Sequence, residues 1–245
     1  MKFGLKSFAD REYLPTILVI LVCLYSFSLS MKQAAFSMDS HHHGMMFSNA
    51  LDLARGKTPY KEIFIQYGLL TTLVQTIGLT LLGETLLNLG ATTALFYSFS
   101  LFLMYRIWCK FLSRPLAAFA SIPVFLIHPF VVYPWPNYIA FTFLLTGILL
   151  YIESRFSRNR PYNYVGLFAC GVFFGLSALA RESSALFVLV PLLALGAIDL
   201  YSTSQNDGES QASPLHANLL LTAGALLPIM IFLSYLWLND VIDDW

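Results

Sequence analysis

The sequence predicts an all-α, polytopic membrane protein with about seven transmembrane helices and a long first extracytoplasmic loop. Of its 245 residues, 57% are hydrophobic and 11% are charged, against about 25% charged residues in a typical soluble domain. Lipid offers no water to backbone groups, so only helices or closed barrels span it, and barrel alternation is absent from this sequence. The formal net charge is zero, which argues against a nucleic-acid partner because phosphate neutralisation needs a cationic face.

The first predicted span covers residues 13–30 and follows Lys2, Lys6 and Arg11. This pattern also fits a cleaved secretory signal peptide. The length of the run and the apolar runs that follow favour an anchor that stays in the membrane. The other predicted spans cover residues 86–105, 115–132, 138–153, 162–180, 184–201 and 217–238. We assign residues 1–245 to a single transmembrane domain.

Residues 66–83 form an apolar run that contains four threonines and Gln75. In a helix, the threonines and Gln75 fall largely on one side. The other side carries Leu69, Leu70, Leu73, Val74, Ile77 and Leu81. An amphipathic helix of this kind suits a membrane interface better than the lipid interior, so we expect it to lie flat.

The basic residues favour this flat arrangement, because short cytoplasmic loops are enriched in Lys and Arg. If residues 66–83 do not span, nine of the 14 basic residues are cytoplasmic: Lys2, Lys6, Arg11, Arg106, Lys110, Arg114, Arg155, Arg158 and Arg160. The five outside are Lys32, Arg55, Lys57, Lys61 and Arg181. If the segment spans instead, the later loops exchange sides and most basic residues lie outside.

This topology gathers the unusual polar segments on one face. The loop 31–84, the segment 128–137, the turn 181–184 and the end 239–245 all fall outside the cytoplasm. Residues 202–216 are Ser-rich, contain Gly and Pro, and are predicted to form a cytoplasmic linker.

The first loop is predicted to contain a helix over residues 41–55, capped by Ser40. Gly56 ends this helix and Pro59 prevents its return. Asp39 then lies at the helix N-terminus, where partial positive charge favours an ionised carboxylate. Asp39 is either a general base or only a helix cap.

His41, His42 and His43 are consecutive and raise the question of a metal site. Consecutive helical residues point about 100° apart, so the three imidazoles cannot meet one ion. A divalent metal would need Asp39 or another ligand from elsewhere in the chain. The alternative that we favour is that the imidazoles contact substrate or the interface.

The first loop also contains the strings DSHHHG, ALDLARGKTPYKEIFIQYG and LLGETLL. They resemble the first extracytoplasmic loop of the GT-C membrane glycosyltransferases, the family of the protein O-mannosyltransferases and the lipid A aminoarabinose transferases. The matching residues are Asp39, Ala50, Leu53, Gly56, Pro59, Tyr60, Phe64, Tyr67, Gly68 and Gly83. The string GVFFGLSALARE, residues 171–182, resembles the family's small-residue helix that ends in a basic residue. The resemblance covers roughly residues 10–200.

The resemblance implies a multi-pass protein, expected in a bacterial inner membrane, with its active face outside the cytoplasm. The implied reaction moves a sugar from a polyprenyl-phosphate carrier to a lipid, glycan or protein acceptor. It needs a base for the acceptor and positive charge for the departing phosphate. We expect Asp39 to be the base and expect no cofactor. Candidate substrate contacts are His41, His42, His43, Arg55, Lys61, Glu62, Tyr67, Asn137 and Arg181.

Several of these residues have a second interpretation. Arg181 is either a phosphate contact or a membrane-edge anchor paired with Glu182. Glu62 is either a second acid or a solvated loop carboxylate. The aromatic residues at 133, 135 and 138 either stack on a sugar or belong to an interfacial belt, which we favour.

The sequence departs from the family pattern at Asn137, where many relatives carry a second acid. Relatives also usually continue into further helices after the position of Trp245, so we expect a short or truncated member. Two other classes remain open. One is a non-catalytic remnant or partner subunit of the same fold. The other is a transporter or flippase, which usually places ionisable groups at mid-membrane, whereas these spans are nearly free of charge.

Overall fold

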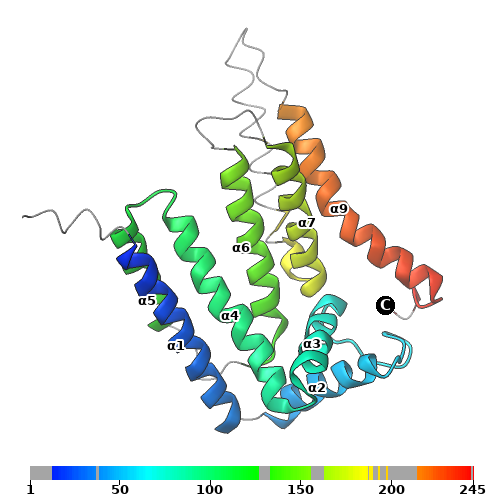
Figure 1. Cartoon of the computed structure of the whole chain (residues 1–245). Helices are drawn as coiled ribbons and strands as arrows, with labels where there is room; N and C mark the ends of the chain where they lie inside the picture. The colour runs from blue at the N-terminus through cyan, green and yellow to red at the C-terminus, as the bar shows by residue number, and fades with distance from the viewer. Residues whose placement is uncertain are drawn as a thin grey trace, which may run out of the picture.

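The computed structural model describes residues 13–36, 39–126, 133–155, 163–186, 188–189, 193, 197, 214–243 and 245. Within these residues every regular element is a helix, and the all-α prediction is confirmed (Figure 1). The helices are α1 Leu14–Phe36, α2 Ser40–Ala54, α3 Leu69–Leu82, α4 Leu86–Trp108, α5 Arg114–Leu126, α6 Pro136–Arg155, α7 Tyr164–Ala180 and α9 Pro214–Leu238.

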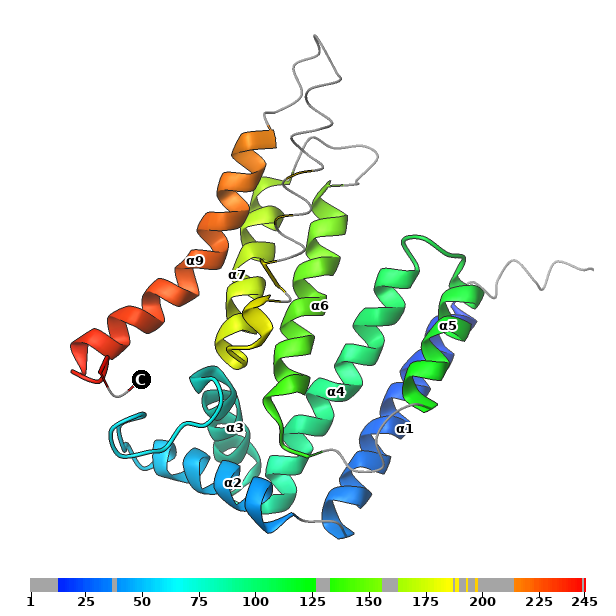
Figure 2. The same ribbon diagram turned by 180° about the vertical axis from the view of Figure 1, so that it is seen from behind.

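The long helices pack side by side, and α2 lies across one end of them (Figures 1 and 2). Helix α4 packs against α6, α6 against α7, and α7 against α9. Helices α1 and α5 pack against α4 on the side away from α6. Helix α3 sits beside α2 and contacts α4, α6 and α7 at the same end. The helices of the predicted first loop, α2 and α3, are therefore packed onto one end of the long helices.

Among the described residues, four helices are long and apolar enough to cross a membrane: α1, α4, α6 and the His216–Leu238 part of α9. Helix α7, over the predicted span 162–180, is a shorter apolar helix. Helix α5, with 13 residues from Arg114 to Leu126, covers the first part of the predicted span 115–132. Residues 127–132 and most of the predicted span 184–201 lie outside the described part of the chain. The linker predicted over 202–216 also lies largely outside it.

The first helix runs to Phe36, six residues beyond the predicted end of the first span. The prediction stopped at 30 because Lys32 and Gln33 are polar. At a helix end, however, a lysine stem can stay against apolar surface while its ammonium reaches water. The first loop is thus shorter than the predicted 31–84, because residues 31–36 belong to α1.

The outer faces of the edge helices are apolar and exposed, as expected for surfaces that contact lipid. On α1 the exposed side chains include Ile17, Leu21 and Leu24, and on α9 they include Met230 and Ile231. Buried positions between helices carry large apolar side chains such as Phe174 and Ile139, together with small or hydroxyl side chains such as Ser100 and Thr142. A Cβ at Gly171 of α7 would overlap the carbonyl oxygen of Leu221 in α9, so this glycine permits the close approach of the two helices.

The predicted division of α3 into a polar and an apolar side is seen in part, and the first half of its polar side faces the protein. Thr80 of the polar side is exposed, and Leu69 of the predicted apolar side is buried. Thr71, Thr72 and Gln75 are buried, whereas Ile77 and Leu81 are 57% and 77% exposed. The Gln75 amide donates to the Pro134 carbonyl at 2.8 Å, and the Thr71 hydroxyl donates to the Ala180 carbonyl at 2.7 Å. Thr76 also donates to the Ala50 carbonyl of α2 at 3.0 Å, so the polar side of α3 supplies hydrogen bonds to three other segments of the chain.

The loop between α2 and α3 turns at Gly56, whose φ of 83° lies in the left-handed region that glycine adopts readily. This confirms the predicted end of the first-loop helix. The Asn49 amide of α2 donates to the Phe64 carbonyl at 2.8 Å and holds the returning loop against α2. The backbone N–H of Thr58 donates to the Glu62 carboxylate at 2.7 Å.

Candidate functional site

Asp39 occupies the N-cap of α2, one residue before the position predicted for the cap. Its backbone is extended, with φ −82° and ψ 114°, and its Oδ1 accepts the backbone N–H of His41 at 2.9 Å. Its other carboxylate oxygen, Oδ2, contacts Nδ1 of His42. Helix formation alone requires only the first of these contacts. The carboxylate is therefore a cap that is also bonded to an imidazole.

The three histidines have different environments. His41 is exposed and its ring packs edge-on to His42, with 5.1 Å between ring centroids. His42 is partly exposed and contacts Asp39. His43 is 1% exposed, and its Nδ1 accepts the backbone N–H of Asp39 at 3.2 Å. Because Nδ1 is an acceptor, the proton of the neutral ring resides on Nε2, which has no hydrogen-bond partner among the described residues.

Two aromatic residues that precede α6 lie against these imidazoles. Tyr133 and Trp135 stack on each other, with ring centroids 5.2 Å apart and planes 22° apart. Trp135 lies 5.6 Å from His42, and Tyr133 lies 5.8 Å from His43, measured between ring centroids. These aromatic residues, for which the interfacial belt was the favoured interpretation, form one wall of the Asp39 site.

The electrostatics of this site favour an ionised carboxylate beside a neutral buried ring. The hydrogen bonds from His42 and from the backbone of His41 hold the pKa of Asp39 below its usual value. Burial lowers the pKa of His43, because the charged ring would lose its hydration. At neutral pH Asp39 is thus an acceptor of protons or hydrogen bonds, and His43 is a neutral donor.

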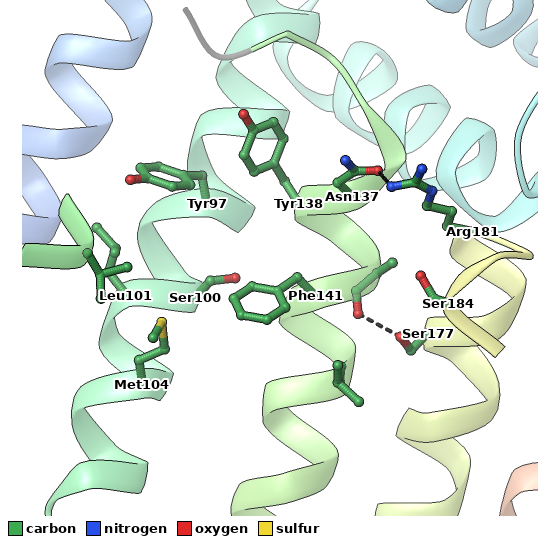
Figure 3. A pocket seen from close by; sticks show the side chains of 13 residues that line it. Tyr97, Ser100, Leu101, Met104, Asn137, Tyr138, Phe141, Ser177, Arg181 and Ser184 are labelled. Atoms are coloured by element: carbon green, nitrogen blue, oxygen red, sulfur yellow. Dashed lines mark hydrogen bonds between the residues drawn. The ribbon is translucent and has the colours of Figure 1, made fainter. Parts of the chain in front are cut away.

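A second group of polar residues lies where α6 begins and α7 ends. The Arg181 guanidinium donates to the side-chain oxygen of Asn137, as Figure 3 shows. The adjacent Glu182 carboxylate accepts the indole N–H of Trp245 at 3.2 Å. The carbonyl of Ala180, the residue before Arg181, accepts a hydrogen bond from the Thr71 hydroxyl. In the part of the chain that the structure describes, the Arg181 side chain therefore bonds to a neutral amide, and no ion pair joins it to Glu182.

A pocket of about 450 Å³ extends from Arg181 and Asn137 between α4, α6 and α7. Its deeper lining is mainly apolar and includes Leu101, Met104 and Phe141 (Figure 3). The pocket therefore has one cationic, hydrogen-bonding end and a largely apolar body.

Helix α3 connects these two polar groups. Gln75 bonds to Pro134, which lies between Tyr133 and Trp135, and Thr71 bonds to the residue before Arg181. Residues 71 and 75 are about one helical turn apart, or about 6 Å along the axis. The Asp39 wall and the Arg181 pocket thus flank the same buried side of α3.

The other predicted contacts lie apart from these groups. Arg55 is exposed and 4.0 Å from Glu84. Lys61 is exposed, and Glu62 is an exposed carboxylate whose pKa is lowered mainly by the backbone N–H of Thr58. Tyr67 packs against the buried cluster of Met46, Ala50, Leu79 and Leu89. The structure therefore brings Asp39, His42 and His43 together, and Asn137 with Arg181, but does not join Arg55, Lys61, Glu62 or Tyr67 to either group.

Among the residues that the structure describes, no three His, Cys, Asp or Glu side chains are arranged to hold a metal ion. The contacts of His42 and His43 are to one carboxylate and one backbone N–H.

Gln75 and Thr71 were not predicted as parts of the site, and Asn137 was not predicted to pair with Arg181. The signal for the first two was present, because polar residues on one side of an apolar helix need partners wherever that side is buried. The Asn137–Arg181 pair joins residues 44 positions apart, and nothing in the local sequence indicates it. Comparisons of the chain with protein-family models, with curated proteins and with solved structures found no match.

Proposed function

We propose that this protein is a membrane glycosyltransferase of the GT-C type that moves a sugar from a polyprenyl-phosphate carrier to an acceptor hydroxyl or amine. The observation that carries this proposal is the pocket with Arg181 and Asn137 at one end and an apolar body. A polyprenyl phosphate has the same two parts, a charged phosphate and a long apolar chain. The first-loop resemblance supports the same reaction.

The transfer needs two kinds of help from the protein. The acceptor oxygen or nitrogen attacks the anomeric carbon, the bond to the phosphate oxygen breaks, and the phosphate leaves with the electron pair. A base takes the acceptor proton, and a cation stabilises the charge on the phosphate. Asp39 fits the first role because its carboxylate is ionised and partly exposed, with a side-chain exposure of 33%. Arg181 fits the second.

Arg181 suits a phosphate because its guanidinium can donate several N–H groups in a planar fork. Its contact with Asn137 uses Nη1 and neutralises no charge. A carboxylate at residue 137 would instead compensate the arginine and compete with the phosphate. The departure from the family pattern at Asn137 is therefore compatible with donor binding.

Because Asp39 contacts His42, either of the two side chains could be the group that takes the acceptor proton. Either the carboxylate takes the acceptor proton itself, or it holds His42 so that the free ring nitrogen, Nε2, takes it. His42→Asn distinguishes these two alternatives. If Asp39 is the base, the variant should transfer sugar at a rate within a few-fold of the parent. If the His42 imidazole is the base, the transfer rate should fall about 100-fold or more.

The direct test is an assay of sugar transfer from synthetic polyprenyl-phosphate sugars by the purified protein in lipid nanodiscs, with membranes of an expressing host supplying acceptors. Labelled product that requires Asp39 supports the proposal. If no donor in a panel of hexose and pentose carriers is consumed, although the lipid carrier binds at the Arg181 pocket, the chain is a non-catalytic partner of the same fold.

We also propose seven spans, with the α2–α3 end of the bundle outside the cytoplasm. A cysteine in place of exposed Glu62 should react with an impermeant thiol reagent added outside intact cells. A cysteine in place of Ser157, which lies outside the described residues, should react only after the cells are opened. Both are placed in a background without Cys23, Cys109 and Cys170. Reaction of the two cysteines from the same side contradicts this topology.

A further inference from the structure

The last turn of α7 is held in place by the beginning of α3. The Thr71 hydroxyl of α3 donates to the Ala180 carbonyl at 2.7 Å, and both residues are fully buried. The last four carbonyls of an α-helix have no partner within the helix, so Thr71 satisfies one of them from outside. Arg181 follows directly, and its backbone is extended, with φ −150° and ψ 115°. The point at which the chain leaves α7 is therefore fixed by a side chain of α3.

Gly68, the residue before α3, lies against the same turn of α7. A Cβ at this position would clash with the carbonyl oxygens of Leu179 and Ala180. The φ of Gly68 is −57°, which any residue adopts, so the glycine serves the close approach of the two backbones and not a special conformation. Gly68 also accepts the backbone N–H of Thr71 at 3.1 Å, so both contacts with α7 come from one turn of the chain.

Helix α6 contacts the same turn of α7. The Ser177 hydroxyl donates to the Ala140 carbonyl at 2.8 Å, and the Arg181 guanidinium donates to Asn137 (Figure 3). Ser177 and Arg181 are four residues apart, so both lie on the side of α7 that faces α6. Arg181 is therefore fixed by α3 through its backbone and by α6 through its side chain.

We propose that Thr71 and Gly68 are positioning residues for Arg181. Through the α7 backbone they hold its guanidinium at the end of the pocket of about 450 Å³. This inference rests on the proposed function, because it takes Arg181 as the contact for the carrier phosphate. A planar guanidinium makes two parallel N–H···O bonds only at one distance and orientation, so a small shift of its backbone weakens both. Neither Thr71 nor Gly68 is among the described residues that line the pocket, so they act on the phosphate through Arg181.

The first test is the affinity of a synthetic polyprenyl-phosphate sugar for the full-length protein in lipid nanodiscs. Thr71→Val keeps the shape of the side chain and removes its hydroxyl, and it should weaken donor binding about fivefold, the effect of one hydrogen bond. Thr71→Ser keeps the hydroxyl and should bind within about twofold of the parent. The matched control is Thr93→Val in α4, because the Thr93 hydroxyl is also buried but bonds to the Leu89 carbonyl of its own helix at 3.2 Å. This control variant should bind the donor as the parent does.

A double-mutant comparison separates positioning from a purely structural role. If Thr71 acts through Arg181, Thr71→Val should change donor affinity by less than about twofold when Arg181→Ala is already present. A structural role would lower the affinity by the same factor with or without Arg181. Equal factors in the two backgrounds therefore overturn the inference.

A second measurement needs no donor. It is hydrogen exchange at the Arg181 backbone N–H, which bonds to the Ser177 carbonyl at 3.2 Å. Loss of the Thr71 contact should loosen this turn and speed the exchange about fivefold, whereas Thr93→Val should leave it unchanged. If the parent binds no polyprenyl phosphate, the proposed function fails, while faster exchange in Thr71→Val still supports the positioning of Arg181. Exchange equal to that of the parent overturns the inference.

If Thr71→Val does not fold, Thr71→Cys takes its place in both measurements. Its thiol is a weak donor, so donor affinity and exchange should change in the same directions by smaller factors. Values equal to those of the parent for both quantities overturn the inference in this variant as well.

Discussion

The two ends of this helix bundle differ in the burial of their polar side chains. At the α2 end, Asp39, His43 and Gln75 are bonded to backbone or side-chain groups within the protein, and two of the three are nearly inaccessible to water. At the opposite end, Lys110 and Glu153 form an ion pair at the surface. A fixed internal arrangement is what a reaction site needs.

The difference has an energetic consequence. A buried polar group that loses its partner costs about 1–3 kcal/mol, because it keeps its desolvation penalty. An exposed ion pair contributes about 0–1 kcal/mol. Substitutions at the α2 end should therefore alter rate or stability strongly, and matched substitutions at the other end should alter them weakly.

The largest effect is expected at Asp39. Asp39→Asn retains an oxygen that can cap α2, since Asn caps about as well as Asp, but it removes the basic carboxylate. We expect sugar transfer to fall about 100-fold or more, while the unfolding temperature in detergent stays close to that of the parent. Measuring both quantities on one preparation separates the two roles. A normal rate in this variant would leave Asp39 as a cap and direct the search for a base to His42 or Glu62.

The next effect is expected at Arg181. Arg181→Ala removes the cation at the end of the 450 Å³ pocket and should weaken binding of the polyprenyl-phosphate sugar by about 1.5–3 kcal/mol, the range for a charged hydrogen bond. Arg181→Lys keeps the charge without the planar fork and should fall in between. Donor affinity is measured in nanodiscs. Lys110→Ala at the opposite end is the control and should bind the donor normally. If Arg181→Ala binds as tightly as the parent, Arg181 is only a membrane-edge anchor.

The sequence predicted the all-helical fold and the position of α2, because composition, Gly56 and Pro59 are local signals. It also predicted that the threonines and Gln75 share one side of residues 66–83. It could not predict that Thr71 and Gln75 are buried, because their burial depends on Ala180 and Pro134, which are 109 and 59 residues away from them. Asp39 was predicted as a candidate base from its local position before a helix. The contacts of Tyr133 and Trp135 with the histidines join distant parts of the chain, and they were not predicted.

A smaller effect, on stability, is expected when Gln75 is replaced. Comparing this variant with one at Lys110 compares the two ends of the bundle directly. Gln75→Leu leaves the Pro134 carbonyl without its donor and should destabilise the protein by about 1–3 kcal/mol. For a chain of this size this corresponds to a fall of roughly 2–4 °C in unfolding temperature per kcal/mol. Lys110→Gln, which breaks an exposed pair at 2.7 Å, should cost about 1 kcal/mol or less. Equal losses in the two variants would contradict the contrast between a buried and a solvated end.

The smallest effect is the pH dependence that His43 confers. Burial lowers its pKa below the ordinary 6.5, so the unfolded chain binds more protons than the folded one as the pH falls through 6.5. The stability due to the neutral ring is therefore complete above about pH 6.5 and declines as the pH falls toward the folded pKa. Asp39 stays ionised throughout this interval, because its pKa lies below 3.8.

We therefore expect the unfolding temperature in detergent to decrease between pH 7 and pH 5, and the decrease to be smaller in His43→Gln. His41→Gln replaces the exposed neighbour and should retain the slope of the parent. Comparing these two variants separates the contribution of the buried His43 ring to the pH dependence, because His42 is present in both. An equal loss of slope in the two variants would show that the pH dependence belongs to the exposed surface of α2 and not to its buried side.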